Sequence, residues 1–165
     1  MPCKTFRTAL ATGASALILS AGLQAQAGET GVFMVRQELP VLAHVDLAEK
    51  GASHGDMLAF QAKITTEDGA PGTLNGLLIT VDIADGTLDP LEERIGQLVF
   101  DFGNGDSVLA AGQSVYPGTE HEISADAPQR RAVIGGTGIY MGARGQITTT
   151  RNTDGSYEHM FELID

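Results

Sequence analysis

The fold is decided by one glycine-rich stretch, Ala132-Val133-Ile134-Gly135-Gly136-Thr137-Gly138-Ile139-Tyr140-Met141-Gly142-Ala143-Arg144-Gly145. A strand followed by Gly-Gly-Thr-Gly first suggests a dinucleotide-binding turn. The last glycine of such a turn would fall on Met141, however, and the polar and β-branched residues 145–150 do not form a helix that could face a pyrophosphate. The chain after Gly145 is also too short for a βαβ unit. The stretch therefore predicts a turn between two strands, not a nucleotide site.

Turn dipeptides divide the rest of the chain into strand-length runs. Asp-Gly and Asn-Gly supply the positive φ angles that tight hairpins need, and they occur at 68–69, 85–86, 104–105 and 154–155, with Pro-Gly at 117–118. The runs between them are typical of β-strands. They cover residues 57–65, 74–84, 92–102, 107–116, 130–134, 143–152 and 156–164, and 32–45, interrupted by Pro40, adds one or two more.

Apolar and polar residues alternate within these runs, which predicts one face toward a core and one toward water. On one face lie Leu58, Phe60, Ala62 and Ile64, and in the last run Tyr157, His159, Phe161 and Leu163; Gly145, Ile147 and Thr149 lie opposite Arg144. No helix is predicted to cover the edges of such a sheet, so closure is the simplest way to protect them. We expect an all-β protein, an eight-stranded antiparallel up-and-down β-barrel.

The first 27 residues have the pattern of a secretory signal peptide. Lys4 and Arg7 precede an uncharged, mostly apolar run, and Ala25-Gln26-Ala27 provides a small-x-small cleavage site. The run is too short and too weakly apolar for a spanning helix. We therefore predict a signal peptide over 1–27, cleavage after Ala27, and a single barrel domain over 28–165 that is secreted or periplasmic, with no membrane insertion after cleavage.

Charge and cysteine content exclude several functions for that domain. It would carry eight Lys and Arg against 21 Asp and Glu, a net charge of −13, which disfavours binding to nucleic acids and anionic membranes. Cys3, the only cysteine, precedes the cleavage site, so disulfides, thiolate catalysis and cysteine metal sites are excluded. His44 with Asp46, and His121 between Glu120 and Glu122, lack a second ligand cluster, so no metal site is predicted.

The glycine-rich stretch resembles the signature of the dirigent and allene oxide cyclase superfamily, in which Gly-Gly-Thr-Gly, an aromatic residue and Ala-Arg-Gly follow a strand in this order. The resemblance extends to Gly55-Asp56-Met57-Leu58-Ala59-Phe60, Gly76-Leu77-Leu78 and the stretch 105–112, and so covers roughly residues 46–163. It implies a calycin-like barrel, often oligomeric, whose open end holds a small hydrophobic molecule. No metal or organic cofactor is implied. A homo-oligomer is compatible with this resemblance.

The resemblance does not specify a reaction. The consecutive aspartates of plant dirigent proteins are replaced by Gln61, Ala62 and Lys63, and the cysteine and proline features of allene oxide cyclases have no counterpart. Within the signature we interpret Gly135, Gly136, Thr137, Gly138 and Gly145 as structural turn residues.

Three residues are candidates for catalysis. Arg144 serves either as a structural ion-pair partner or as a cation that polarises a ligand oxygen inside the pocket. Tyr140 either closes the barrel end or donates a proton. His159 shares the apolar face with Tyr157 and Phe161, where it is either a hydrogen-bonded core residue or an acid–base group. If that face lines a pocket, Phe60, Tyr157 and Phe161 are its ligand contacts.

Two functions remain open from the sequence. The first is a cofactor-free cyclase or isomerase that folds an unsaturated substrate inside a dry pocket. The alternative is a non-catalytic barrel that binds a small apolar compound or serves as a structural envelope module. Polar side chains that converge inside an apolar cavity would favour the enzyme, and an interior filled by side chains would favour the structural module.

Overall fold

The computed structural model describes residues 31–47, 50–83, 91–117 and 122–164. The predicted signal peptide and the turn dipeptide at 85–86 lie outside these residues, as do Glu120 and His121. The described residues form antiparallel strands and one short 3-10 turn, η1. The elements are β1 (Gly31–Gln37), β2 (Val41–Val45), β3 (Met57–Thr66), β4 (Pro71–Asp82), β5 (Leu91–Gly103), β6 (Asp106–Pro117), β7 (Gln129–Thr137), η1 (Gly138–Tyr140), β8 (Arg144–Arg151) and β9 (Tyr157–Ile164).

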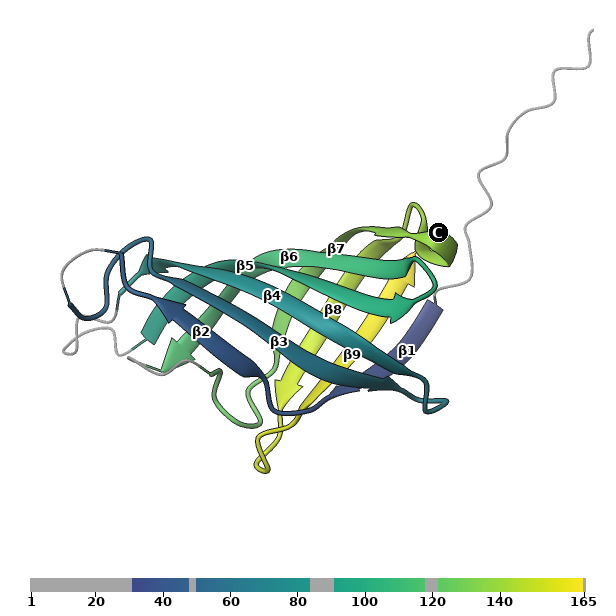
Figure 1. Ribbon diagram of the computed structural model, residues 1–165, viewed down its shortest axis with the longest axis horizontal. Helices are drawn as coiled ribbons and strands as arrows, with labels where there is room; N and C mark the ends of the chain where they lie inside the picture. Colours follow the sequence, from purple (N-terminus) through teal and green to yellow (C-terminus); the bar gives the residue numbers. More distant parts are fainter. Residues whose placement is uncertain (1–30, 48–49, 84–90, 118–121, 165) are drawn as a thin grey trace, which may run out of the picture.

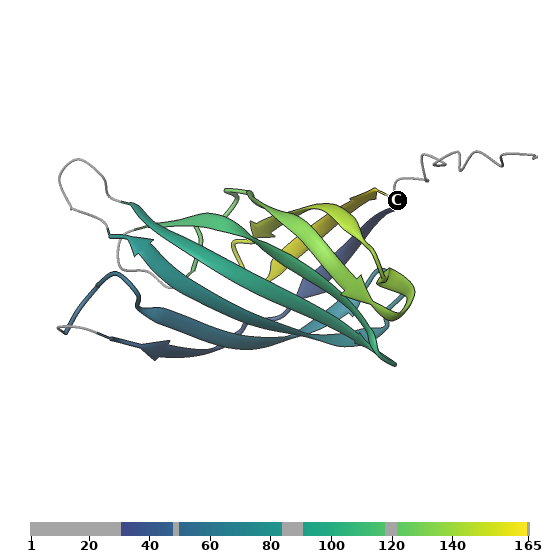
Figure 2. The same cartoon turned by 90° about the horizontal axis from the view of Figure 1, so that it is seen from above.

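The strands form a closed barrel in up-and-down order, as predicted. The sheet runs β1-β9-β8-β7-β6-β5-β4-β3-β2, and β1 also pairs with β3 through Val35–Thr66 to Gln37–Ile64, which closes eight strands into a barrel. The strands run obliquely along its long axis (Figures 1 and 2). Closure leaves few strand edges for pairing with other chains.

The front of the chain supplies two strands because Pro40 divides it. β1 lies between β9 and β3, whereas β2 pairs only with β3, from Val41–Gln61 to Val45–Met57. Proline has no amide hydrogen to donate to a neighbouring strand, so the run breaks at this residue. β2 is the last strand in the order of the sheet and lies outside the closed ring of eight. It therefore extends the wall beyond the closed part of the barrel (Figure 1).

The predicted alternation agrees with the burial of the side chains. Leu58, Ala62 and Ile64 of β3 are buried, as are Tyr157, His159 and Phe161 of β9, while their sequence neighbours are more exposed. One buried cluster fills the end of the barrel near η1 and is centred on Phe100 and Phe161. A second and smaller cluster lies toward the β2 end; it consists of Leu58, Leu78, Tyr116, Ile123 and Tyr157.

The glycine-rich stretch differs from the expected turn in one respect, because β7 continues through Gly135, Gly136 and Thr137 and the turn starts at Gly138. The register between β6 and β7 shifts after Leu109–Gly135 to Ala110–Val133, so Ile134 forms a bulge. Gly138 has φ +60°, and a Cβ atom there would lie 1.9 Å from Oδ1 of Asp106. That carboxylate accepts a hydrogen bond from the amide of Ile139 at 3.0 Å, so glycine lets the turn fold onto Asp106.

Candidate functional site

A cavity lies inside the barrel at the end where β2 extends the wall. Its apolar lining comes mainly from Leu42, Leu58, Phe60, Leu74, Leu78, Leu98 and Ile123, and its polar lining from Gln37, Tyr116, Glu122, Arg131, Thr149, Tyr157 and His159. The cavity between these side chains has a volume of about 50 Å³. That is room for a few waters or for a short apolar chain.

Inward-facing glycines give the apolar wall its shape. Phe60 pairs across the sheet with Gly76, and Leu78 pairs with Gly96. A Cβ atom at Gly76 would lie 2.2 Å from the Phe60 ring, and one at Gly96 would lie 2.2 Å from Cδ2 of Leu78. Each large side chain therefore lies against a neighbouring strand that has no side chain at that point, and the space in the barrel centre stays open.

His159 lies at the inner end of the cavity and is held on both ring nitrogens. Nε2 is 2.8 Å from Oε1 of Gln37, and Nδ1 is 2.9 Å from Oγ1 of Thr149. Since Oε1 can only accept, Nε2 carries the proton and Thr149 donates to Nδ1. Burial, and secondarily the charge of Arg131, lower the pKa of His159 to about 3. The imidazole is therefore neutral at physiological pH.

Arg131 brings a guanidinium into the same cavity from β7. Its side chain is 6% exposed, and its Cγ lies against Gly112. Nη2 donates to Oγ of Ser114, which in turn donates to the Tyr116 hydroxyl at 3.2 Å. Burial lowers the pKa of Arg131, and Tyr116 acts in the opposite direction. These groups form a small cluster of donors on the wall formed by β6 and β7.

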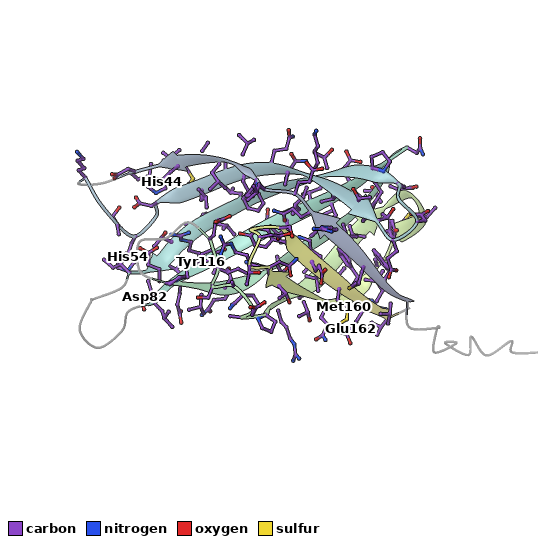
Figure 3. The ribbon with its side chains drawn as sticks, turned by 90° about the horizontal axis from the view of Figure 1, so that it is seen from below. His44, His54, Asp82, Tyr116, Met160 and Glu162 are labelled. Carbon is purple, nitrogen blue, oxygen red and sulfur yellow. The ribbon has the colours of Figure 1, made fainter. Side chains whose placement is uncertain are left out.

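A buried ion pair supports that cluster from the side. Arg94 Nη2 donates to Glu92 Oε2 at 2.7 Å, and both side chains are almost completely buried. The Arg94 guanidinium also lies 4.3 Å from the centre of the Tyr116 ring, a cation–π contact. Figure 3 places Tyr116 toward the same end of the barrel as His44 and His54, away from Met160 and Glu162. Tyr116 is therefore held at two points, its ring by Arg94 and its hydroxyl by Ser114.

The cavity mouth is closed in part by residues that follow β6. Tyr157 donates to Glu122 Oε1 at 3.1 Å, and Arg151 donates to Glu122 Oε2 at 2.8 Å. Burial, followed by the charge of Glu122, raises the pKa of Tyr157. The phenol therefore stays protonated and acts as a donor, while Ile123 beside it is buried in the apolar wall.

Three of the residues proposed from the sequence lie together in this cavity, namely Phe60, Tyr157 and His159. Phe161 does not line it. Its side chain is fully buried and stacks on Phe33 with 4.6 Å between ring centres, so it belongs to the core near η1. The alternation placed Phe161 correctly on the inner face. On that face of β9, however, Tyr157 and His159 line the cavity, whereas Phe161 belongs to the packed core.

Tyr140 and Arg144 lie at the other end of the barrel. Tyr140 is half-buried and packs beside Phe102, 5.2 Å between ring centres, and Phe33; burial raises the pKa of its hydroxyl. Arg144 is exposed at the start of β8, opposite Ile164. Neither side chain lines the cavity. Tyr140 packs among aromatic rings at the end of the barrel near η1, and Arg144 lies on the surface at that end.

Sequence reasoning missed Tyr116 and Arg131, which line the cavity from β6 and β7, and the buried Ser114 that is hydrogen-bonded to both. Ser114 and Tyr116 follow Val108 and Ala110 at two-residue spacing, and Arg131 is two residues before Val133. The same alternation could have placed all three inside the barrel. Gln37 follows Phe33 and Val35 at the same spacing and could have been placed inside in the same way. Glu122 carried no such signal, because it lies in a loop between strands.

Two further searches cover only the described part of the chain. No three His, Cys, Asp or Glu side chains gather there in a way that could hold a metal ion. No helix in that part is long and apolar enough to cross a bilayer.

Comparison with known proteins shows similarity in structure without similarity in sequence. No family model and no curated protein sequence matches the chain. A pyocyanin demethylase superimposes with a TM-score of 0.57 at 19% identity, over 81% of this chain and 99% of that one. A Diels Alderase from Streptomyces koyangensis gives 0.58 at 14% identity, over 86% and 70% of the two chains.

A dirigent protein is also among the similar structures. This pterocarpan synthase superimposes with a TM-score of 0.52 at 16% identity, over 84% of this chain and 86% of that one. These identities establish a shared fold and not a shared activity. The barrel closure, the strand order and these superpositions together show that the chain shares the antiparallel β-barrel fold of these proteins, one of which is a dirigent protein.

Proposed function

We propose that this protein binds a small, mostly apolar compound in the cavity at the β2 end and acts on it as a cofactor-free cyclase or isomerase. The observation that carries the proposal is the convergence of polar side chains from four strands on one apolar cavity: Gln37, Tyr116, Arg131 and His159. A barrel with a purely structural role would be filled by side chains, and a simple carrier would not need this convergence.

The residues of the cavity suggest how such a reaction would be assisted. The apolar wall around Phe60 and Leu78 would hold a flexible chain in a folded shape and exclude water. Arg131 and Tyr116 would stabilise negative charge that develops on a substrate oxygen. The Diels Alderase and the dirigent protein that share this fold support a reaction of this class. Each step would rearrange bonds within one molecule, with no net gain or loss of atoms.

One observation favours non-catalytic binding as the second candidate. Both nitrogens of His159 are occupied by Thr149 and Gln37, and its lowered pKa makes it a poor proton acceptor at neutral pH. Tyr157 is likewise held as a donor to Glu122. A binding protein would need only these fixed donors and the apolar wall.

One experiment separates the two candidates. The purified protein is exposed to an extract of its source cells, bound small molecules are identified by mass spectrometry, and each is then incubated with fresh protein. A cyclase or isomerase would convert the captured compound into a product of equal mass and different retention time. Recovery of the unchanged compound would support the binding function, and failure to capture any compound would contradict both.

We also propose that the protein acts outside the cytoplasm, on the strength of the charged, apolar and small-residue pattern of residues 1–27. The mass of the protein recovered from the extracytoplasmic fraction tests this directly. We expect a chain that begins at Gly28. A full-length chain recovered only from the cytoplasm would contradict the proposal.

A further inference from the structure

Arg131 is a buried cation without a carboxylate partner. The ion pairs among the described residues join Arg36 to Asp154, Arg94 to Glu92 and Arg151 to Glu122, and none includes Arg131. Its Nη2 atom donates to the neutral hydroxyl of Ser114, and its Nε atom is buried with no partner in the described part of the chain. A buried guanidinium in this state is costly unless an anion joins it.

The other charged groups around the cavity compensate one another. Glu122 at the mouth is shared by Arg151 and the Tyr157 hydroxyl, and Glu92 is paired with Arg94. His159 is neutral between Gln37 and Thr149. The described cavity lining therefore carries one positive charge that no described carboxylate balances, and that charge lies on Arg131.

The surroundings of Arg131 define the shape of a matching ligand. The guanidinium lies on the β6–β7 wall beside Ser114 and Tyr116, while Leu58, Leu78 and Leu98 line the same cavity. An anionic oxygen could receive charge-assisted hydrogen bonds from the guanidinium, which are stronger than those between neutral groups. The attached carbon skeleton would then lie along the leucine side chains.

We infer that the cavity is specific for apolar compounds that carry one anionic oxygen group, such as a carboxylate, and that Arg131 is the residue that recognises this group. The inference rests on the proposed function, since it names the ligand class of the same cavity. In this account Arg131 both binds the ligand and makes the cavity prefer anionic ligands over neutral ones. The apolar wall alone would accept a chain with or without an anionic group.

A pair of probes that differ only in the charged group tests this. Octanoate and 1-octanol are titrated into the protein at pH 7.5 by calorimetry. We expect octanoate to bind at least about tenfold more tightly, the ratio that one charge-assisted hydrogen bond supplies. Equal affinities would overturn the inference and leave the proposed function intact. Binding of neither probe would overturn both.

Two variants assign the preference to the residue. Arg131→Met keeps an unbranched apolar stem and removes the charge, and we expect it to bind octanoate and 1-octanol equally, with the affinity for 1-octanol within about twofold of the original. Arg130→Met changes the neighbouring exposed residue of β7 and should keep the preference. A preference that survives in Arg131→Met would overturn the assignment. The comparison of probes on the unaltered protein needs no variant to fold.

Discussion

The Nε2 atom of His159 donates to Oε1 of Gln37 over 2.8 Å, and this hydrogen bond joins the last strand of the barrel to the first from inside the wall. Both side chains are almost completely buried. The contact links closure of the barrel to the inner end of the cavity, because Gln37 is the last residue of β1 and lines the cavity together with His159.

Stability should depend on pH through His159. The pKa of His159 is about 3 in the folded protein, whereas the ordinary value for histidine is 6.5. Between these two pH values the unfolded chain therefore binds a proton at His159 that the folded protein does not. Stability is therefore full above pH 6.5 and falls as the pH drops toward 3. Between pH 7.5 and 5 this group should account for a loss of about 2 kcal/mol in the free energy of unfolding.

Urea unfolding at the two pH values measures that loss. In His159→Gln the difference between pH 7.5 and 5 should shrink by about the same 2 kcal/mol, while the exposed His54→Gln should behave like the unaltered protein. An unchanged pH dependence in His159→Gln would show that His159 is charged or exposed in the folded state.

The glycines of the signature should differ sharply in their tolerance of alanine. Gly138→Ala forces a residue with a side chain into φ +60° and into Asp106, and we expect a loss of at least about 2 kcal/mol. Gly135→Ala enters open space and should change stability by less than about 0.5 kcal/mol. Thermal unfolding compares the two, and equal losses would contradict the described turn.

Gly76 should control the size of the cavity. In Gly76→Ala the new methyl group would displace the Phe60 ring, whose easiest movement is into the cavity, at a cost of about 1–3 kcal/mol in stability. Because the displaced ring would occupy part of the cavity, the affinity for 1-octanol should also fall. Adding Phe60→Leu removes the ring and should restore binding. Failure of the double variant to recover would show that Gly76 acts through something other than Phe60.

The buried pair of Glu92 and Arg94 should be sensitive to removal of one partner. Glu92→Gln removes the buried carboxylate that pairs with Arg94, and a loss of about 3–5 kcal/mol in the free energy of unfolding is expected. The double variant Glu92→Leu, Arg94→Met should lose less. Glu93→Gln, on the opposite face of β5, is the control for the substitution itself. A loss in the double variant equal to that in Glu92→Gln would contradict this account.

Most of the barrel could be predicted from local sequence. Two-residue alternation and Asp-Gly or Asn-Gly turns act over a few residues, and they predicted the strands to within a few positions. The closed architecture followed from the number of strands and their order. The extension of β7 through Gly135 to Thr137 was not predicted, because the bulge at Ile134 depends on pairing with β6.

The site was predicted less well because it depends on which parts of the inner face are packed. Alternation placed His159 and Phe161 on the same face, but only the three-dimensional packing puts one in the cavity and the other in the core. Attention to the glycine-rich signature favoured Arg144, although alternation already placed it opposite Ile147. The same rule applied to Val133 would have identified Arg131 as the inward-facing arginine.

The central claim is that the ligand site is the cavity at the β2 end, and amide chemical shifts measured by NMR during a titration with 1-octanol test it most directly. We expect the largest changes at residues around the cavity, such as Leu58, Tyr116 and His159, and small changes at Ile139 within η1 and Met141 directly after it. Changes concentrated at η1 or on the outer wall around Leu77 and Ile95, with none around the cavity, would contradict it.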